Sequence, residues 1–86
     1  MSDPMAILKV LKEVGNELSR AEDIFRSFHS SHEGYAVLKE EVDELWGAIK
    51  NKEPKATTAR AKILRKEAIQ VAAMAVRFVL DVTGDG

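Results

Sequence analysis

The sequence has no cysteine, only two prolines and no long uninterrupted apolar run. The absence of cysteine excludes disulfides, thiolate metal sites and cysteine nucleophiles, so any bound metal must use oxygen or nitrogen ligands. The first segment, MSDPMAILKVLKEVG, mixes an aspartate and two lysines with its apolar residues. That mixture argues against a signal peptide and against a membrane span. We therefore expect a cytoplasmic protein with no membrane partner.

An excess of charge of one sign is also missing. Lysine and arginine number 13 against 14 aspartates and glutamates, which gives a net charge of −1. Binding to a nucleic acid polymer usually requires a basic surface, so we expect no such partner, and a helical DNA-binding module is disfavoured. The 86 residues have room for one domain, 1–86. A domain this short buries a small share of its surface, which makes self-association worth expecting.

The few helix breakers are widely spaced, which favours long helices. The spacing predicts a first helix from about Pro4 to Phe28, with Asp3 as its cap, because apolar residues recur there at steps of three and four. Ser30 and Glu33 form a capping-box pattern that predicts the start of a second helix, extending to about Lys50.

A polar connection containing Pro54 follows, after which Thr57 or Thr58 can start a third helix that ends near Val82. No stretch alternates apolar and polar residues over enough positions to indicate a sheet. The predicted fold class is all-α, with three helices in a single domain.

The second predicted helix has an apolar stripe that we expect to be core: Leu38, Val42, Leu45 and Ile49. At about 100° per residue, Glu41 and Glu44 fall beside that stripe, whereas Glu40 points farther round the helix. Two glutamates therefore lie at the boundary of the buried face. Most glutamate pairs one turn apart simply form a solvated surface, so this pair alone does not define a site.

The third predicted helix is apolar on almost every side in its C-terminal half, EAIQVAAMAVRFVLDV. A helix that is apolar all round is normally buried all round, which a three-helix monomer does not easily achieve. We therefore predict a homo-oligomer, either a dimer or a tetramer. Glu67 and Gln70 share a stripe of this helix with Ile63, Met74 and Phe78. Burying an ionised glutamate without a partner is costly, so Glu67 is expected to have a cation beside it.

Packing of the Glu41 and Glu44 face against the Glu67 and Gln70 face would bring several carboxylates together. A divalent cation would relieve their mutual repulsion most simply, although Arg77 is a second source of positive charge on the third helix. Oxygen ligands without cysteine indicate Mg²⁺ or Mn²⁺ rather than a structural zinc.

The segments EEVDE, residues 40–44, and KEAIQ, residues 66–70, resemble the EExxE and ExxD motifs of the MazG-like all-α nucleoside triphosphate pyrophosphohydrolases. The resemblance covers the second and third helices, roughly half the chain, and the segment HEGYAVLKEEVDELW looks like the small single-domain members. It implies that these two helices form a four-helix bundle across a subunit interface. It also implies Mg²⁺-dependent cleavage of a (d)NTP into a (d)NMP and pyrophosphate, which would serve nucleotide-pool cleanup.

By this resemblance, Glu41, Glu44 and Glu67 are metal ligands, and Glu40 and Glu41 are the catalytic residues. Glu40 corresponds to the first glutamate of the motif and would assist the site or orient water. Gln70 stands where the family motif has aspartate. Its amide oxygen can still bind a hard cation, but it brings no charge.

Other polar residues have two interpretations each. His32 can contact phosphate or base, but a histidine beside a helix start, like its neighbour His29, is more often a surface residue. Arg60 can reach a phosphate, but its basic neighbours indicate a solvated face. Arg77 and Asp81 lie one turn apart and either pair with each other or help to hold substrate.

Tyr35 and Trp46 can stack on a base, although packing in the core or at a subunit interface is the commoner use of such residues. The main rival to an enzyme is a non-catalytic helical oligomerisation or interaction protein whose glutamates are only surface charge. A di-iron carboxylate bundle is disfavoured because neither Glu41 nor Glu67 is followed by histidine at the required spacing.

Overall fold

The computed structural model describes residues 1–84, which form three helices: α1 (Pro4–Ile24), α2 (Ser31–Lys50) and α3 (Thr57–Val82). These residues contain no strand, so the all-α prediction is confirmed. None of the three helices carries a stretch long and apolar enough to cross a bilayer.

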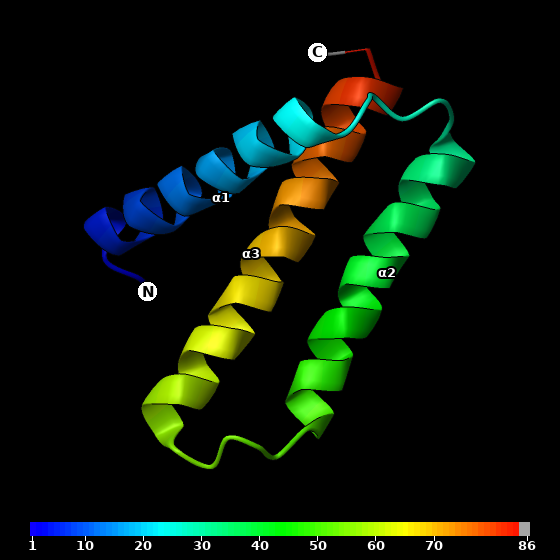
Figure 1. The fold of residues 1–86 in the computed structure, drawn as a ribbon. Helices are drawn as coiled ribbons and strands as arrows, with labels where there is room; N and C mark the ends of the chain where they lie inside the picture. The colour runs from blue at the N-terminus through cyan, green and yellow to red at the C-terminus, as the bar shows by residue number, and fades with distance from the viewer. Residues whose placement is uncertain (85–86) are drawn as a thin grey trace.

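The helices α2 and α3 run antiparallel and side by side, joined by the turn at residues 51–56 (Figure 1). The C-terminal half of α1 packs across α3, and α1 diverges from α3 toward its own N-terminus (Figure 1). The buried core lies where these two helices meet, and it consists of Val14, Ala21, Ala73 and Met74. The helix α3 is thus the central element, with one neighbour on each of two sides.

Local capping chemistry sets where two of the helices begin. The Asp3 carboxylate accepts a hydrogen bond from the amide of Met5 at 3.1 Å, with Pro4 in the first turn. The Ser30 hydroxyl accepts from the Glu33 amide at 3.1 Å, as the capping box predicts. The Glu33 carboxylate reaches back to the amide of His29 at 2.9 Å, one residue before the cap itself.

The other predicted boundaries agree with the structure less fully. The helix α3 begins at Thr57, as predicted, and its capping residue is Ala56, with no side-chain hydrogen bond at the cap. The helix α1 ends at Ile24 rather than near Phe28, because Phe25 is already extended at φ −115° and ψ 144°. The chain leaves the helix there so that Phe28 can be buried and its amide can donate to Asp81 at 3.1 Å. Tertiary contacts end this helix, not its own periodicity.

The predicted core stripe of α2 is only half covered. Leu38 and Leu45 are half-buried, whereas Val42 and Ile49 remain 44% and 42% exposed. The prediction that the whole stripe is core is therefore wrong for the single chain. The rotation of α2 about its own axis explains this exposure, because α3 packs nearer to the Glu41 side of α2 and leaves Val42 and Ile49 uncovered.

Candidate metal centre and adjoining cavity

Three glutamates from two helices converge where α2 packs on α3. Glu41 and Glu44 come from α2 and Glu67 from α3, and one carboxylate oxygen of each lies within 4.8 Å of the other two. Glu41 and Glu67 are half-buried, whereas Glu44 is exposed. The sequence predicted this convergence from helical geometry, and the antiparallel packing of α2 and α3 brings it about.

The local electrostatics of this cluster are unfavourable without a cation. Burial raises the pKa of the Glu41 carboxyl, and the charge of Glu44, a hydrogen bond with Glu44 and the charges of Glu67 and Glu17 raise it further. One oxygen of Glu41 and one of Glu67 are buried with no hydrogen-bond partner. Within residues 1–84, none of the ion pairs involves a member of this cluster. Buried, unpartnered carboxylate oxygens at this separation fit a hard divalent cation.

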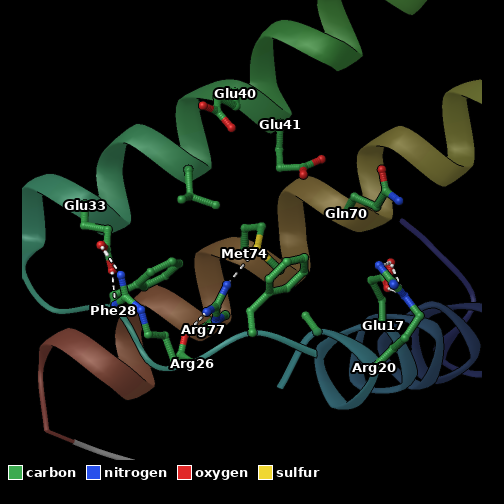
Figure 2. A pocket seen from close by; sticks show the side chains of 13 residues that line it. Glu17, Arg20, Arg26, Phe28, Glu33, Glu40, Glu41, Gln70, Met74 and Arg77 are labelled. Carbon is green, nitrogen blue, oxygen red and sulfur yellow. Dashed lines mark hydrogen bonds and ion pairs between the residues drawn. The ribbon is translucent and has the colours of Figure 1, made fainter. Parts of the chain in front are cut away.

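Gln70 lies one turn beyond Glu67 on α3. Figure 2 shows the side chains of Gln70 and Glu41 projecting toward each other from α3 and α2. The pKa of Glu17, on α1, is held below its ordinary value by a hydrogen bond from Arg20, with a smaller contribution from Gln70. Gln70 therefore interacts with the α1 carboxylate. Whether its amide oxygen binds metal stays a prediction.

A cavity of about 390 Å³ adjoins Glu41 (Figure 2). We call it the Glu41 cavity. Its apolar wall includes Phe25, Phe28, Val37 and Met74, and its polar wall includes Glu40 and Gln70 together with two ion pairs. These pairs join Arg20 to Glu17 at 2.7 Å and Arg26 to Glu33 at 3.3 Å. The cavity thus combines an apolar middle with charged groups at its edges.

The sequence did not single out Glu17, Arg20 or Phe25 as site residues. Glu17 did carry a signal, because it lies between Val14 and Ala21 on the apolar face of α1, where a charged residue is unexpected. Phe25 carried a misleading one, since its spacing continues that apolar face although the helix ends before it. Only the position of α1 on α3 brings these side chains to the cavity.

Of the predicted substrate-binding residues, Arg77 and Asp81 form the ion pair that their spacing suggested, at 3.6 Å. The Arg77 guanidinium is buried, lies 4.1 Å from the centre of the Phe28 ring and donates to the carbonyl of Arg26. Arg77 also lines the Glu41 cavity. The pair holds the linker between α1 and α2 on the end of α3, and a role toward substrate stays a prediction.

The remaining predicted residues lie around the cluster rather than in it. Arg60 lines a second cavity together with Glu44 and Glu67, but its guanidinium donates to the carbonyls of Ile49, at 2.7 Å, and Asn51. His32 is exposed in the first turn of α2, and Glu40 is exposed at the wall of the Glu41 cavity.

The two candidate stacking residues of α2 lie elsewhere. Tyr35 and Trp46 are 62% and 55% exposed, so neither packs in the core of the single chain, and packing at a subunit interface stays a prediction. Neither side chain lines the Glu41 cavity. Their position does not support base stacking beside the carboxylate cluster.

Comparisons with protein-family models, with curated proteins and with solved structures found no match to this chain. The resemblance of residues 40–44 and 66–70 to the MazG-like motifs therefore stays a prediction.

Proposed function

We propose that this protein is a Mg²⁺-dependent nucleoside triphosphate pyrophosphohydrolase, which converts a (d)NTP and water into a (d)NMP and pyrophosphate. The observation that carries the proposal is the convergence of Glu41, Glu44 and Glu67, with two buried carboxylate oxygens that lack a partner. A cavity large enough for a small molecule starts at Glu41. Removal of unwanted nucleotides is the role that we propose for this activity.

In this proposal, Glu41, Glu44 and Glu67 hold Mg²⁺, or Mn²⁺ in its place, and Gln70 adds an uncharged oxygen. Bound Mg²⁺ supplies positive charge that offsets the charge of the triphosphate and lowers the pKa of coordinated water. The three glutamates supply three negative charges, and Gln70 gives the site one negative charge fewer than the family motif would.

The reaction needs a base as well as a metal. The oxygen of water forms a bond to the α-phosphorus. The bond from that phosphorus to the oxygen that bridges the α- and β-phosphates breaks, and pyrophosphate leaves with the electron pair. Glu40 is exposed at the wall of the Glu41 cavity and is free of the ion pairs nearby, so it can orient the water and accept its proton. Glu41 contributes to catalysis in this proposal by holding the cation that activates the water.

We also propose that the protein works as a homo-oligomer, in which α2 and α3 pair with the same helices of a second copy to form a four-helix bundle. Both helices keep apolar side chains exposed in the single chain: Val42, Trp46 and Ile49 on α2, and Val76 and Val79 on α3. Burial of such side chains favours association. Light scattering of the purified protein would distinguish a dimer, a tetramer and a monomer.

The test is release of pyrophosphate from a panel of ribo- and deoxyribonucleoside triphosphates in Mg²⁺, by wild type, Glu41→Gln and Asp43→Asn. Asp43 is a matched control, since it lies on the same helix with its side chain exposed and paired with Lys39 at 2.9 Å. We expect Asp43→Asn to match wild type and Glu41→Gln to lose more than about a hundredfold, because a metal contributes several kcal/mol to such a step.

Failure to hydrolyse any nucleotide, or equal rates in wild type and Glu41→Gln, would overturn the proposal. The rival non-catalytic assembly protein predicts no hydrolysis and no change in melting temperature with Mg²⁺ or Mn²⁺. A metal that binds only the folded state must raise that temperature.

A further inference from the structure

The Glu41 cavity is large enough to hold a small molecule. Its volume of about 390 Å³ falls in the range of small-molecule sites, roughly 300 to 1,000 Å³. Glu41 belongs to both the cluster and the cavity wall, whereas Glu44 and Glu67 line the second cavity on the other side. A molecule whose phosphates reach Glu41 would therefore extend its remainder into the Glu41 cavity.

Phe25 offers an aromatic surface in this cavity. It lies in the linker directly after α1, and its side chain is 55% exposed although it lines the cavity. The Phe28 ring is buried and is occupied by the Arg77 guanidinium at 4.1 Å, whereas the same guanidinium is 5.8 Å from the Phe25 ring. Phe25 is thus the aromatic ring of the cavity with surface left for a ligand, and a flat aromatic ligand would stack on it.

The two ends of the cavity are polar and suitably far apart. Glu33 and Glu41 both line it from α2, and eight residues of helix correspond to about 12 Å. An extended nucleoside monophosphate spans a similar length. At the Glu33 end, Arg26 and Glu33 pair through hydrogen bonds of 3.3 Å, so a donor and an acceptor are held together at the surface (Figure 2). The cavity therefore offers charge, then apolar surface, then a donor and acceptor pair.

We propose that the Glu41 cavity binds the nucleoside part of the substrate, with the base stacked on Phe25 and its polar edge toward Arg26 and Glu33. The inference rests on the proposed function, since Glu41 is taken to be near the phosphates. It assigns base binding to the linker between α1 and α2, and not to Tyr35 or Trp46, which lie outside the cavity.

The first test compares Phe25→Leu with Tyr35→Leu. Both changes remove an exposed aromatic ring and keep an apolar side chain, but only Phe25 lines the cavity. Stacking of one base contributes about 1–3 kcal/mol, so Phe25→Leu should raise KM for the hydrolysed nucleotide about five- to 150-fold. Its kcat should change little, and Tyr35→Leu should leave both constants as in wild type.

A second pair of variants blocks the cavity without touching Phe25. Val37→Phe places a larger side chain in the cavity wall, whereas Ala36→Phe places the same side chain at the neighbouring, exposed position. We expect KM to rise in Val37→Phe only. Melting curves with Mg²⁺ should show the same metal-induced shift in both variants, because the carboxylate cluster is unchanged.

Binding of the four common nucleoside 5′-monophosphates, followed by NMR titration, separates this inference from the proposed function. If wild type hydrolyses no nucleotide but binds a monophosphate more tightly than Phe25→Leu does, the proposed reaction is refuted and the nucleoside site is kept. Hydrolysis by wild type with KM unchanged in both Phe25→Leu and Val37→Phe would keep the reaction and overturn the subsite. Equal weakening in Phe25→Leu and Tyr35→Leu would overturn it as well.

Discussion

Replacement of Glu41 by glutamine should stabilise the metal-free protein and destabilise the metal-bound protein relative to wild type. Without metal, Glu41 is a half-buried carboxylate with a raised pKa and one oxygen that has no hydrogen-bond partner. Glutamine has the same shape, carries no charge and can donate its amide to the carboxylates of Glu44 or Glu67. The variant therefore removes repulsion and keeps the packing.

The size of the metal-free effect follows from the burial. An unsatisfied buried polar group costs about 1–3 kcal/mol, and the partial exposure of Glu41 favours the lower end, about 1 kcal/mol. For a domain of this length, that corresponds to a rise in melting temperature of roughly 4–8 °C. The Asp43→Asn control should change the free energy of unfolding by no more than about 0.5 kcal/mol, since Asp43 is exposed.

The direction of the Glu41 pKa shift determines how the stability effect of Glu41→Gln depends on pH. Burial raises the pKa of Glu41 in the folded protein above its ordinary value of 4.5. The contribution of this carboxyl to the free energy of unfolding is therefore fully present below pH 4.5 and is lost as pH rises through the raised pKa. The advantage of Glu41→Gln should be largest at neutral pH and should shrink as pH falls toward 4.5.

Excess Mg²⁺ should make wild type more stable than Glu41→Gln. At ten times the dissociation constant, a cation that binds only the folded state adds about 1.4 kcal/mol to the free energy of unfolding. Wild type should gain this and Glu41→Gln should gain much less, so the melting curves of the two proteins should exchange order. Thermal unfolding followed by circular dichroism, with EDTA and with Mg²⁺, measures all four values. A lower melting temperature for Glu41→Gln in EDTA, or equal Mg²⁺ shifts in both proteins, would refute the reasoning.

Three further predictions concern the scaffold. Asp81→Ala should lower the free energy of unfolding by about 3–5 kcal/mol, because it leaves the buried Arg77 guanidinium without its ion pair and removes the acceptor of the Phe28 amide; urea denaturation with an unchanged midpoint would contradict this. Gly34→Ala should cost about 1–3 kcal/mol, since its added carbon would lie 2.7 Å from a ring atom of Phe78. Gly15→Ala, with nothing within 4 Å, should instead add up to about 1 kcal/mol, so the same sign for both glycine variants would argue against the close packing. Ser30→Ala should lower the melting temperature by roughly 4–8 °C through loss of about 1 kcal/mol at the start of α2, and calorimetry would show no change if the cap were unimportant.

Local sequence signals predicted most of the secondary structure because their causes are local. Asp3 with Pro4, and Ser30 with Glu33, are caps whose hydrogen bonds join residues close together in the chain, and both are present. The start of α3 at Thr57 was also predicted, although no side chain caps that helix. The prediction that α1 ends near Phe28 was wrong because Phe28 is buried beside Arg77 and Asp81 instead of continuing the helix.

The carboxylate cluster was predictable for a similar reason. The 100° step of a helix places Glu41 and Glu44 on one face of α2, and apolar neighbours mark the Glu67 face of α3 as buried. Two helices joined by a short turn pack against each other, so only their mutual rotation was left open. That rotation exposed Val42 and Ile49 and half-buried Glu41, which periodicity alone did not establish.

The sequence by itself determined that the chain is helical, where α2 and α3 run, and that Glu41, Glu44 and Glu67 lie on faces able to meet. The tertiary structure alone decided that α1 crosses α3, and thereby brought Glu17 and Phe25 to the wall of the Glu41 cavity. The physical reason is that helical periodicity fixes directions about one axis. The crossing of two helices depends on contacts between residues such as Val14 and Ala73, which are far apart in the chain.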